Sequence, residues 1–81
     1  MNQKPYQVEA FWDREAQVWV AESEDIPGLV TEADTIEALT AKLRQMIPEL
    51  LQLNHLITHE PQAQITFELI SQRQESIECA V

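Results

Sequence analysis

The stretch DIPGLVTEADT, residues 25–35, decides the fold of this chain. It contains the only glycine, Gly28, directly after Pro27. Because proline presets φ at about −65° and glycine adopts positive φ, the pair predicts a tight turn between two short strands. Asp34 can cap a following helix, and Glu37 can return the second hydrogen bond of a capping box. The stretch therefore predicts strand, turn, strand and capped helix, and it carries no catalytic motif.

Segments on both sides of this stretch alternate between apolar and polar residues, which is typical of half-buried strands. We predict strands over 6–13, 18–22, 29–32 and 65–72, with a hairpin loop at 14–17. Short sequential connections make the first three strands an antiparallel meander.

A long apolar stripe predicts one helix over residues 35–54. Its members recur at steps of three and four residues: Ile36, Leu39, Leu43, Met46, Ile47, Leu50 and Leu53. Pro48 interrupts the helix, but the stripe continues in phase, so we expect a kink there and a stop at Asn54. The fold class is α+β, an antiparallel sheet in β-β-β-α-β order with one long helix packed on one face. We expect a single domain over 1–81, with 73–81 a frayed tail or a strand that pairs only in an oligomer.

Composition narrows the classes of function. Five basic and fourteen acidic residues give a net charge of −9, which opposes direct nucleic-acid binding and suits a basic partner or a solvated acidic surface. A single cysteine, Cys79, fits a reducing compartment. No secretory signal or long apolar run is present, so we expect a cytoplasmic protein without membrane contact or cofactor.

The motifs of the first 54 residues resemble the HicB-like antitoxin superfamily, in particular a small bacterial branch described as a domain of unknown function. The matching pieces are Tyr6-Gln7-Val8, Val18-Trp19-Val20-Ala21, Asp25-Ile26-Pro27-Gly28, Thr31 to Thr35 and Glu37-Ala38. The resemblance implies a partial ribonuclease-H-like sheet with one packed helix. It also implies binding of a small basic endoribonuclease toxin of the HicA type, whose active site the antitoxin covers. Two departures stand out: the sequence stops at Val81, so we expect no C-terminal DNA-binding domain, and Glu32-Ala33 occupies a place where antitoxins carry a glycine.

Two groups of residues are candidates for chemistry. An acidic cluster surrounds the Pro-Gly turn: Glu22, Glu24, Asp25, Glu32 and Asp34. It could hold a metal or a basic partner, although turn formation, helix capping and solvation already account for it. His55 and His59 are four residues apart but lack the His-Glu-x-x-His pattern and follow the expected helix end, so we assign them no metal or catalytic role.

The aromatic residues of the first hairpin predict an interface. Phe11 faces away from Trp12, and Trp19 lies between two valines. Pairing residue 12 with 18 places Phe11 opposite Trp19, whereas pairing 12 with 17 places Trp19 opposite Ala10 and joins Phe11 to the valines. In either register both faces carry large apolar groups, and one helix covers only one face. We therefore expect Phe11, Trp12 and Trp19 to contact a partner or a second copy in a homodimer.

These observations favour a non-enzymatic HicB-like interaction module, an antitoxin-type partner of a small basic toxin or a stand-alone relative. The alternative is a small metal-dependent nuclease or other hydrolase that uses the acidic turn cluster. No phosphate-binding loop, nucleophile elbow or Cys-x-x-Cys motif accompanies that cluster.

Overall fold

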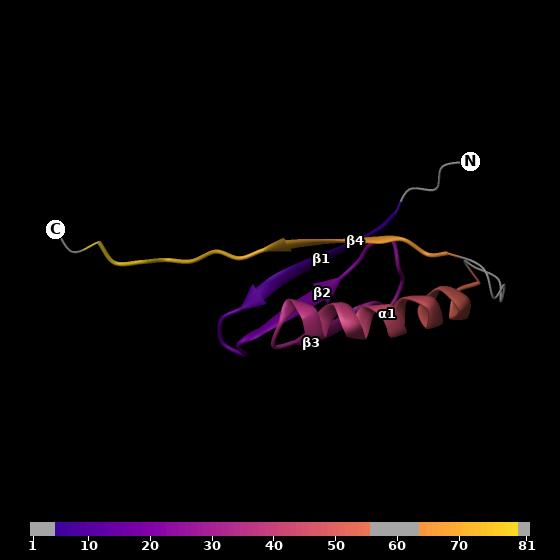
Figure 1. Cartoon of the computed structure of the whole chain (residues 1–81), viewed down its shortest axis with the longest axis horizontal. Helices are drawn as coiled ribbons and strands as arrows, with labels where there is room; N and C mark the ends of the chain where they lie inside the picture. Colours follow the sequence, from indigo (N-terminus) through magenta and orange to yellow (C-terminus); the bar gives the residue numbers. More distant parts are fainter. Residues whose placement is uncertain (1–4, 56–63, 80–81) are drawn as a thin grey trace.

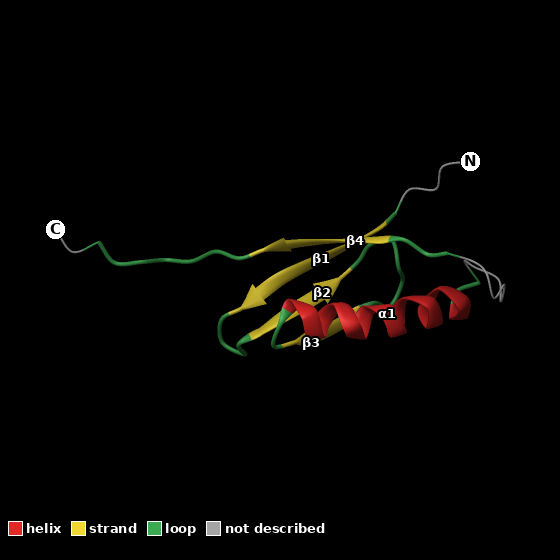
Figure 2. Cartoon of the chain, in the orientation of Figure 1, coloured by secondary structure: helices red, strands yellow, loops and turns green. Residues whose placement is uncertain are grey.

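The structure, a computed structural model, describes residues 5–55 and 64–79. Within these residues, a four-stranded sheet forms one layer and a single helix forms the other (Figures 1 and 2). The elements are β1 (Tyr6–Asp13), β2 (Val18–Glu22), β3 (Val30–Ala33), α1 (Ile36–Leu53) and β4 (Phe67–Gln72). The α+β class, the β-β-β-α-β order and the single helix are as predicted. No described helix is long and apolar enough to cross a membrane.

The prediction of a wholly antiparallel sheet was wrong at β4. The strand order is β3-β2-β1-β4, and β4 runs parallel to β1 at the edge of the sheet. The cause is the crossover through α1. The helix returns the chain from the C-terminal end of β3 to the end of the sheet at which β1 begins. Strand β4 therefore starts beside the first residue of β1 and runs in the same direction as β1.

The hairpin of β1 and β2 adopts neither predicted register. Trp12 lies opposite Trp19, and the pairing closes with Asp13 opposite Val18. The Asp13 carboxylate accepts hydrogen bonds from two loop N–H groups. The backbone carbonyl of Asp13 accepts a third, from the N–H of Gln17 at 2.8 Å. This four-residue loop, with Gln17 at a φ of 58°, sets the register. The predicted pairing of 12 with 17 assigned the faces correctly but is shifted by two residues.

The helix begins one residue later than predicted, at Ile36 and not at Thr35. Thr35, not Asp34, is the N-cap, because its Oγ1 accepts the N–H of Ala38 at 3.0 Å. Glu37 is therefore the second helical residue, one short of the position from which a capping box closes. The helix runs through Pro48 and ends at the C-cap Asn54, as predicted.

The core lies between α1 and the inner face of the sheet, the face toward the helix. The sheet contributes mainly small side chains, and α1 contributes one row of large ones. The buried residues are Val8, Ala10, Ala21, Ile26, Leu29, Ala33, Leu39, Leu43, Ile47 and Leu51. Leu51 replaces Leu53 as the last member of the helical stripe, since Leu53 is 74% exposed.

The Pro-Gly turn adopts the predicted geometry. The Leu29 N–H donates to the Ile26 carbonyl at 3.2 Å, and Gly28 has a φ of 84°. This combination, with Pro27 at the second position, is the type II arrangement that requires glycine at the third. The turn buries Ile26 and Leu29 on either side of it and so joins β2 to β3 over the core.

Candidate interaction surface

The outer face of the sheet, directed away from α1, carries an exposed apolar group. Phe11 lies opposite Val20 of β2 and opposite Gln72 of β4, and Ile70 follows one row away. Phe11 is 41% exposed and Ile70 43% exposed. Since α1 covers only the inner face, no second layer lies over these side chains within residues 5–55 and 64–79. Aromatic and aliphatic groups placed in this way are suited to contact with another molecule.

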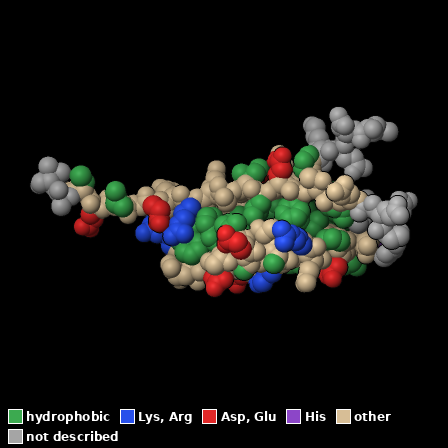
Figure 3. Space-filling model, viewed as in Figure 1, with side chains coloured by type: hydrophobic (Ala, Val, Ile, Leu, Met, Phe, Trp, Pro, Cys, Tyr) green, Lys and Arg blue, Asp and Glu red, His purple; other side chains and the backbone are tan. Residues whose placement is uncertain are grey.

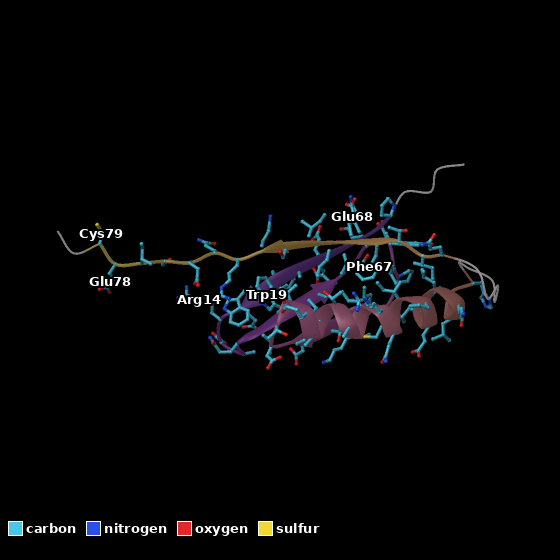
Figure 4. The ribbon with its side chains drawn as sticks, in the orientation of Figure 1. Arg14, Trp19, Phe67, Glu68, Glu78 and Cys79 are labelled. Carbon is cyan, nitrogen blue, oxygen red and sulfur yellow. The ribbon has the colours of Figure 1, made fainter. Side chains whose placement is uncertain are left out.

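The same face carries all the charge of the strands. The five acidic strand residues occupy outward positions: Glu9, Asp13, Glu22, Glu32 and Glu68. None of the four strands contains a lysine or arginine. Figure 4 shows Glu68 directed away from the helix, while its neighbour Phe67 points toward it. Every charged strand residue on the outer face is therefore negative, and the four strands contain no basic side chain that could neutralise these charges.

Two of these carboxylates face each other. Glu9 and Glu22 are Cα partners in the β1–β2 pair, and both are exposed. Like charges directly opposite in an antiparallel pair are destabilising. The next outward-facing row on the same two strands is the Phe11–Val20 pair. An apolar contact thus lies beside a charge pair that a cation would stabilise.

The two tryptophans belong to the inner face, at the opposite side of the sheet from Phe11. Trp12 and Trp19 pack edge to face, with ring centroids 5.5 Å apart and an interplanar angle of 63°. The Arg73 guanidinium lies 4.2 Å from the centroid of Trp12, and its side chain also forms an ion pair with Glu75 at 3.1 Å. The three predicted interface residues therefore do not form one patch. Phe11 faces outward alone, and Trp12 and Trp19 form a half-buried aromatic cluster under Arg73.

The acidic turn cluster is spread over several local roles. Asp25 accepts the N–H of Gln7 at 2.8 Å, and the Ser23 hydroxyl donates to the Gln7 carbonyl, so this end of the turn is tied to β1. Of the other members, Glu22 lies in β2, Glu24 in the loop after it, Glu32 in β3 and Asp34 just before α1. Among the residues that the structure describes, no three His, Cys, Asp or Glu side chains come together as a metal site. His55 is exposed at a φ of 57°, and His59 lies outside the described residues.

Sequence reasoning missed most of the outer face. Val20, Ile70 and the Glu9–Glu22 pair were absent from the predicted interface. The signal was available in part, because Glu9 and Phe11 alternate with buried residues, as do Val20 and Glu22. What could not be predicted was the register that sets them opposite one another.

Comparison with known proteins gives a family and a fold. Residues 5–80 match the family described as Domain of unknown function (DUF1902). Among solved structures, the chain is similar to the crystal structure of hypothetical protein TTHA1013 from the extremely thermophilic bacterium Thermus thermophilus. The two are 45% identical and superpose with a TM-score of 0.67, over 94% of this chain and 100% of that one. No curated protein matches this chain.

Proposed function

This chain belongs to the family described as a domain of unknown function, DUF1902, and we propose that it is a non-enzymatic, HicB-like interaction module that binds a small basic protein on the outer face of its sheet. The observation that carries the proposal is the sorting of charge in the sheet. All five acidic strand residues lie on the face that no helix covers, around the exposed Phe11.

The physical basis is a difference in free energy between the open and the covered face. In the free chain, Glu9 and Glu22 repel each other. A lysine or arginine of a partner placed between them removes that repulsion and gains two attractive contacts. Phe11 and Val20, in the next outward-facing row, supply the apolar contact that complements the charges.

The size of the face sets the expected mode of binding. Four strands about 4.8 Å apart and about 20 Å long give a face of roughly 400 Å². That is about half of the 800 Å² that each partner contributes to a standard interface. Attraction between charges must then supply much of the affinity, so binding should weaken strongly with salt.

The HicB-like resemblance supplies the class of partner, a small basic endoribonuclease toxin of the HicA type. The test begins with the reading frames that adjoin the gene for this chain. A small basic product should inhibit growth when expressed alone, and co-expression of this chain should relieve the inhibition. The two proteins should also purify together. Failure of every small basic neighbour to bind would contradict the proposal.

Matched charge reversals locate the surface. Glu22→Lys on the outer face should abolish co-purification, whereas Glu49→Lys, exposed on α1, should leave it unchanged. Phe11→Glu should also abolish it while the far-ultraviolet circular dichroism of the helix persists. Equal loss with Glu22→Lys and Glu49→Lys would place the partner elsewhere. Metal-dependent RNA cleavage by the purified chain, lost in Asp25→Ala, would favour a hydrolase instead.

A further inference from the structure

The C-terminal arm, residues 73–79, continues in line with β4 and leaves the body of the molecule (Figure 1). Every residue of the arm is exposed, and Ile77 is 93% exposed. Glu78 and Cys79 point to opposite sides of the chain, as neighbours in an extended strand do (Figure 4). The DUF1902 match runs to residue 80, so the arm is part of the family's domain and not an appendage to it.

The two edges of the sheet differ in how they are protected. At the β3 edge, the strand is only four residues long, and the Lys42 ammonium donates to the Glu32 carbonyl at 2.6 Å. At the β4 edge, six residues without lysine or proline pair on one side only, with β1, among the residues that the structure describes. An edge of that kind is a template for a further strand.

The inner side of β4 is also incompletely covered. Helix α1 lies under β2 and β3, away from β4. Ile65, Phe67 and Leu69 are consequently only half-buried. Figure 3 shows a band of hydrophobic side chains exposed between the strand layer and the helix. A strand added beside β4 would cover this band.

We propose that the arm of one chain pairs antiparallel with the free β4 edge of a second copy, and that the two arms are exchanged symmetrically. Because the arm prolongs β4, two such strands laid side by side join the sheets into one continuous sheet of eight strands. We take a second copy as the partner of this edge because the arm carries an apolar residue, Ile77, that is 93% exposed in its own chain. The exchange stands whether or not the outer face binds a basic protein.

Charge and apolar pattern select one register. Centring the pair on Gln72 sets Ile77 opposite Phe67, Cys79 opposite Ile65 and Ser76 opposite Glu68 of the second copy. Centring it on Arg73 would set Arg73 against Arg73 and Glu68 against Glu78, which like-charge repulsion disfavours. In the Gln72-centred register Ile77 meets Phe67 of β4, and Cys79 meets Ile65, which precedes β4; both Phe67 and Ile65 are half-buried.

The native thiol provides the first test. Ile65→Cys should form a disulfide-linked dimer with Cys79 of the second copy under mild oxidation, several times faster than Val30→Cys. Val30 is exposed on the β3 edge and controls for random collisions of the arm. The unmodified chain should crosslink no faster than the Val30→Cys variant, because its two Cys79 thiols lie at opposite ends of the paired strands. Equal rates for the two cysteine variants would overturn the proposal.

The second test is mass in solution by light scattering at micromolar concentration. The full chain should have twice its mass of 9.3 kDa. Ile77→Lys should raise the dimer dissociation constant at least about tenfold, whereas Ser76→Lys, opposite Glu68, should leave the dimer intact. Neither position is packed within its own chain, so circular dichroism should be unchanged in both. A monomer throughout, or a dimer lost in Phe11→Glu but kept in Ile77→Lys, would overturn the arm exchange.

Discussion

The two faces of the sheet are built from the same strands but from different side chains. The inner face carries three alanines, Ala10, Ala21 and Ala33, all of them buried. The outer face carries the five acidic strand residues and Phe11. The small inner residues let α1 approach closely, so the chain completes that face with its own helix. No element of the described chain packs over the outer face, and we propose that another molecule covers it.

The largest difference in stability between substitutions on the two faces should come from the core under the inner face. Leu43 is fully buried beneath the inner face, and truncation to alanine removes its apolar area and leaves a cavity. We expect Leu43→Ala to lower the free energy of unfolding by about 2–5 kcal/mol. Equilibrium urea unfolding, followed by circular dichroism, measures it.

Val30→Ala is the matched control on the outer face, where Val30 is 67% exposed. It should change the free energy of unfolding by no more than about 0.5 kcal/mol. A loss in Val30→Ala comparable to that in Leu43→Ala would mean that the outer face is also packed in the free chain, and the contrast between the faces would fail.

A smaller effect should come from the start of the helix that covers the inner face. Thr35→Ala removes the hydroxyl that accepts the Ala38 N–H, and we expect a loss of about 0.5–2 kcal/mol. Asp34→Ala should cost less, because Asp34 is exposed and is not the cap. Thermal unfolding of the two variants side by side measures the difference. A larger loss of stability in Asp34→Ala than in Thr35→Ala would show that Asp34 is the N-cap.

The sequence predicted the elements better than their pairing. Alternation predicted β1 and β2 to their observed bounds, because each is half-buried and its period is two. The parallel direction of β4 and the Trp12–Trp19 register could not be predicted, because both depend on contacts between residues distant in sequence. Asp34 and Thr35 are both good caps, and only the start of the helix at Ile36 decides between them.

The candidate site was predicted less well than the fold. Phe11 was predicted to lie on the face opposite Trp12, but which of the two faces is exposed was not predicted. Its neighbours come from three different strands, and pairing alone brings them together. Arg73 was not identified at all. Its position over Trp12 depends on the parallel β1–β4 pair, which places the residue after β4 beside the end of β1.

Arg73 provides a third test of the difference between the two faces, because its guanidinium lies over the Trp12–Trp19 pair at one end of the inner face. Arg73→Gln removes the cation above Trp12 but keeps a long polar side chain. We expect the free energy of unfolding to fall by about 0.5–1 kcal/mol and the tryptophan emission to change. Arg44→Gln, exposed on α1, is the control and should change neither. Identical behaviour of the two variants would show that the stacking over Trp12 contributes nothing in solution.

The smallest expected effect is an increase in the free energy of unfolding, and it comes from a substitution on the outer face. Glu22→Gln keeps the shape of the side chain and removes one of two carboxylates that face each other, so we expect a gain of about 0.2–1 kcal/mol. Glu9→Gln should give a similar gain, and the double variant should gain less than the sum, because either change alone relieves the same repulsion. Added salt should reduce the gains by screening the pair. The same variants should bind a basic partner more weakly, so stability and binding should move in opposite directions on this face alone. If Glu22→Gln destabilises the chain, the two carboxylates do not repel each other in the free protein, and the outer face holds no electrostatic free energy for a partner to release.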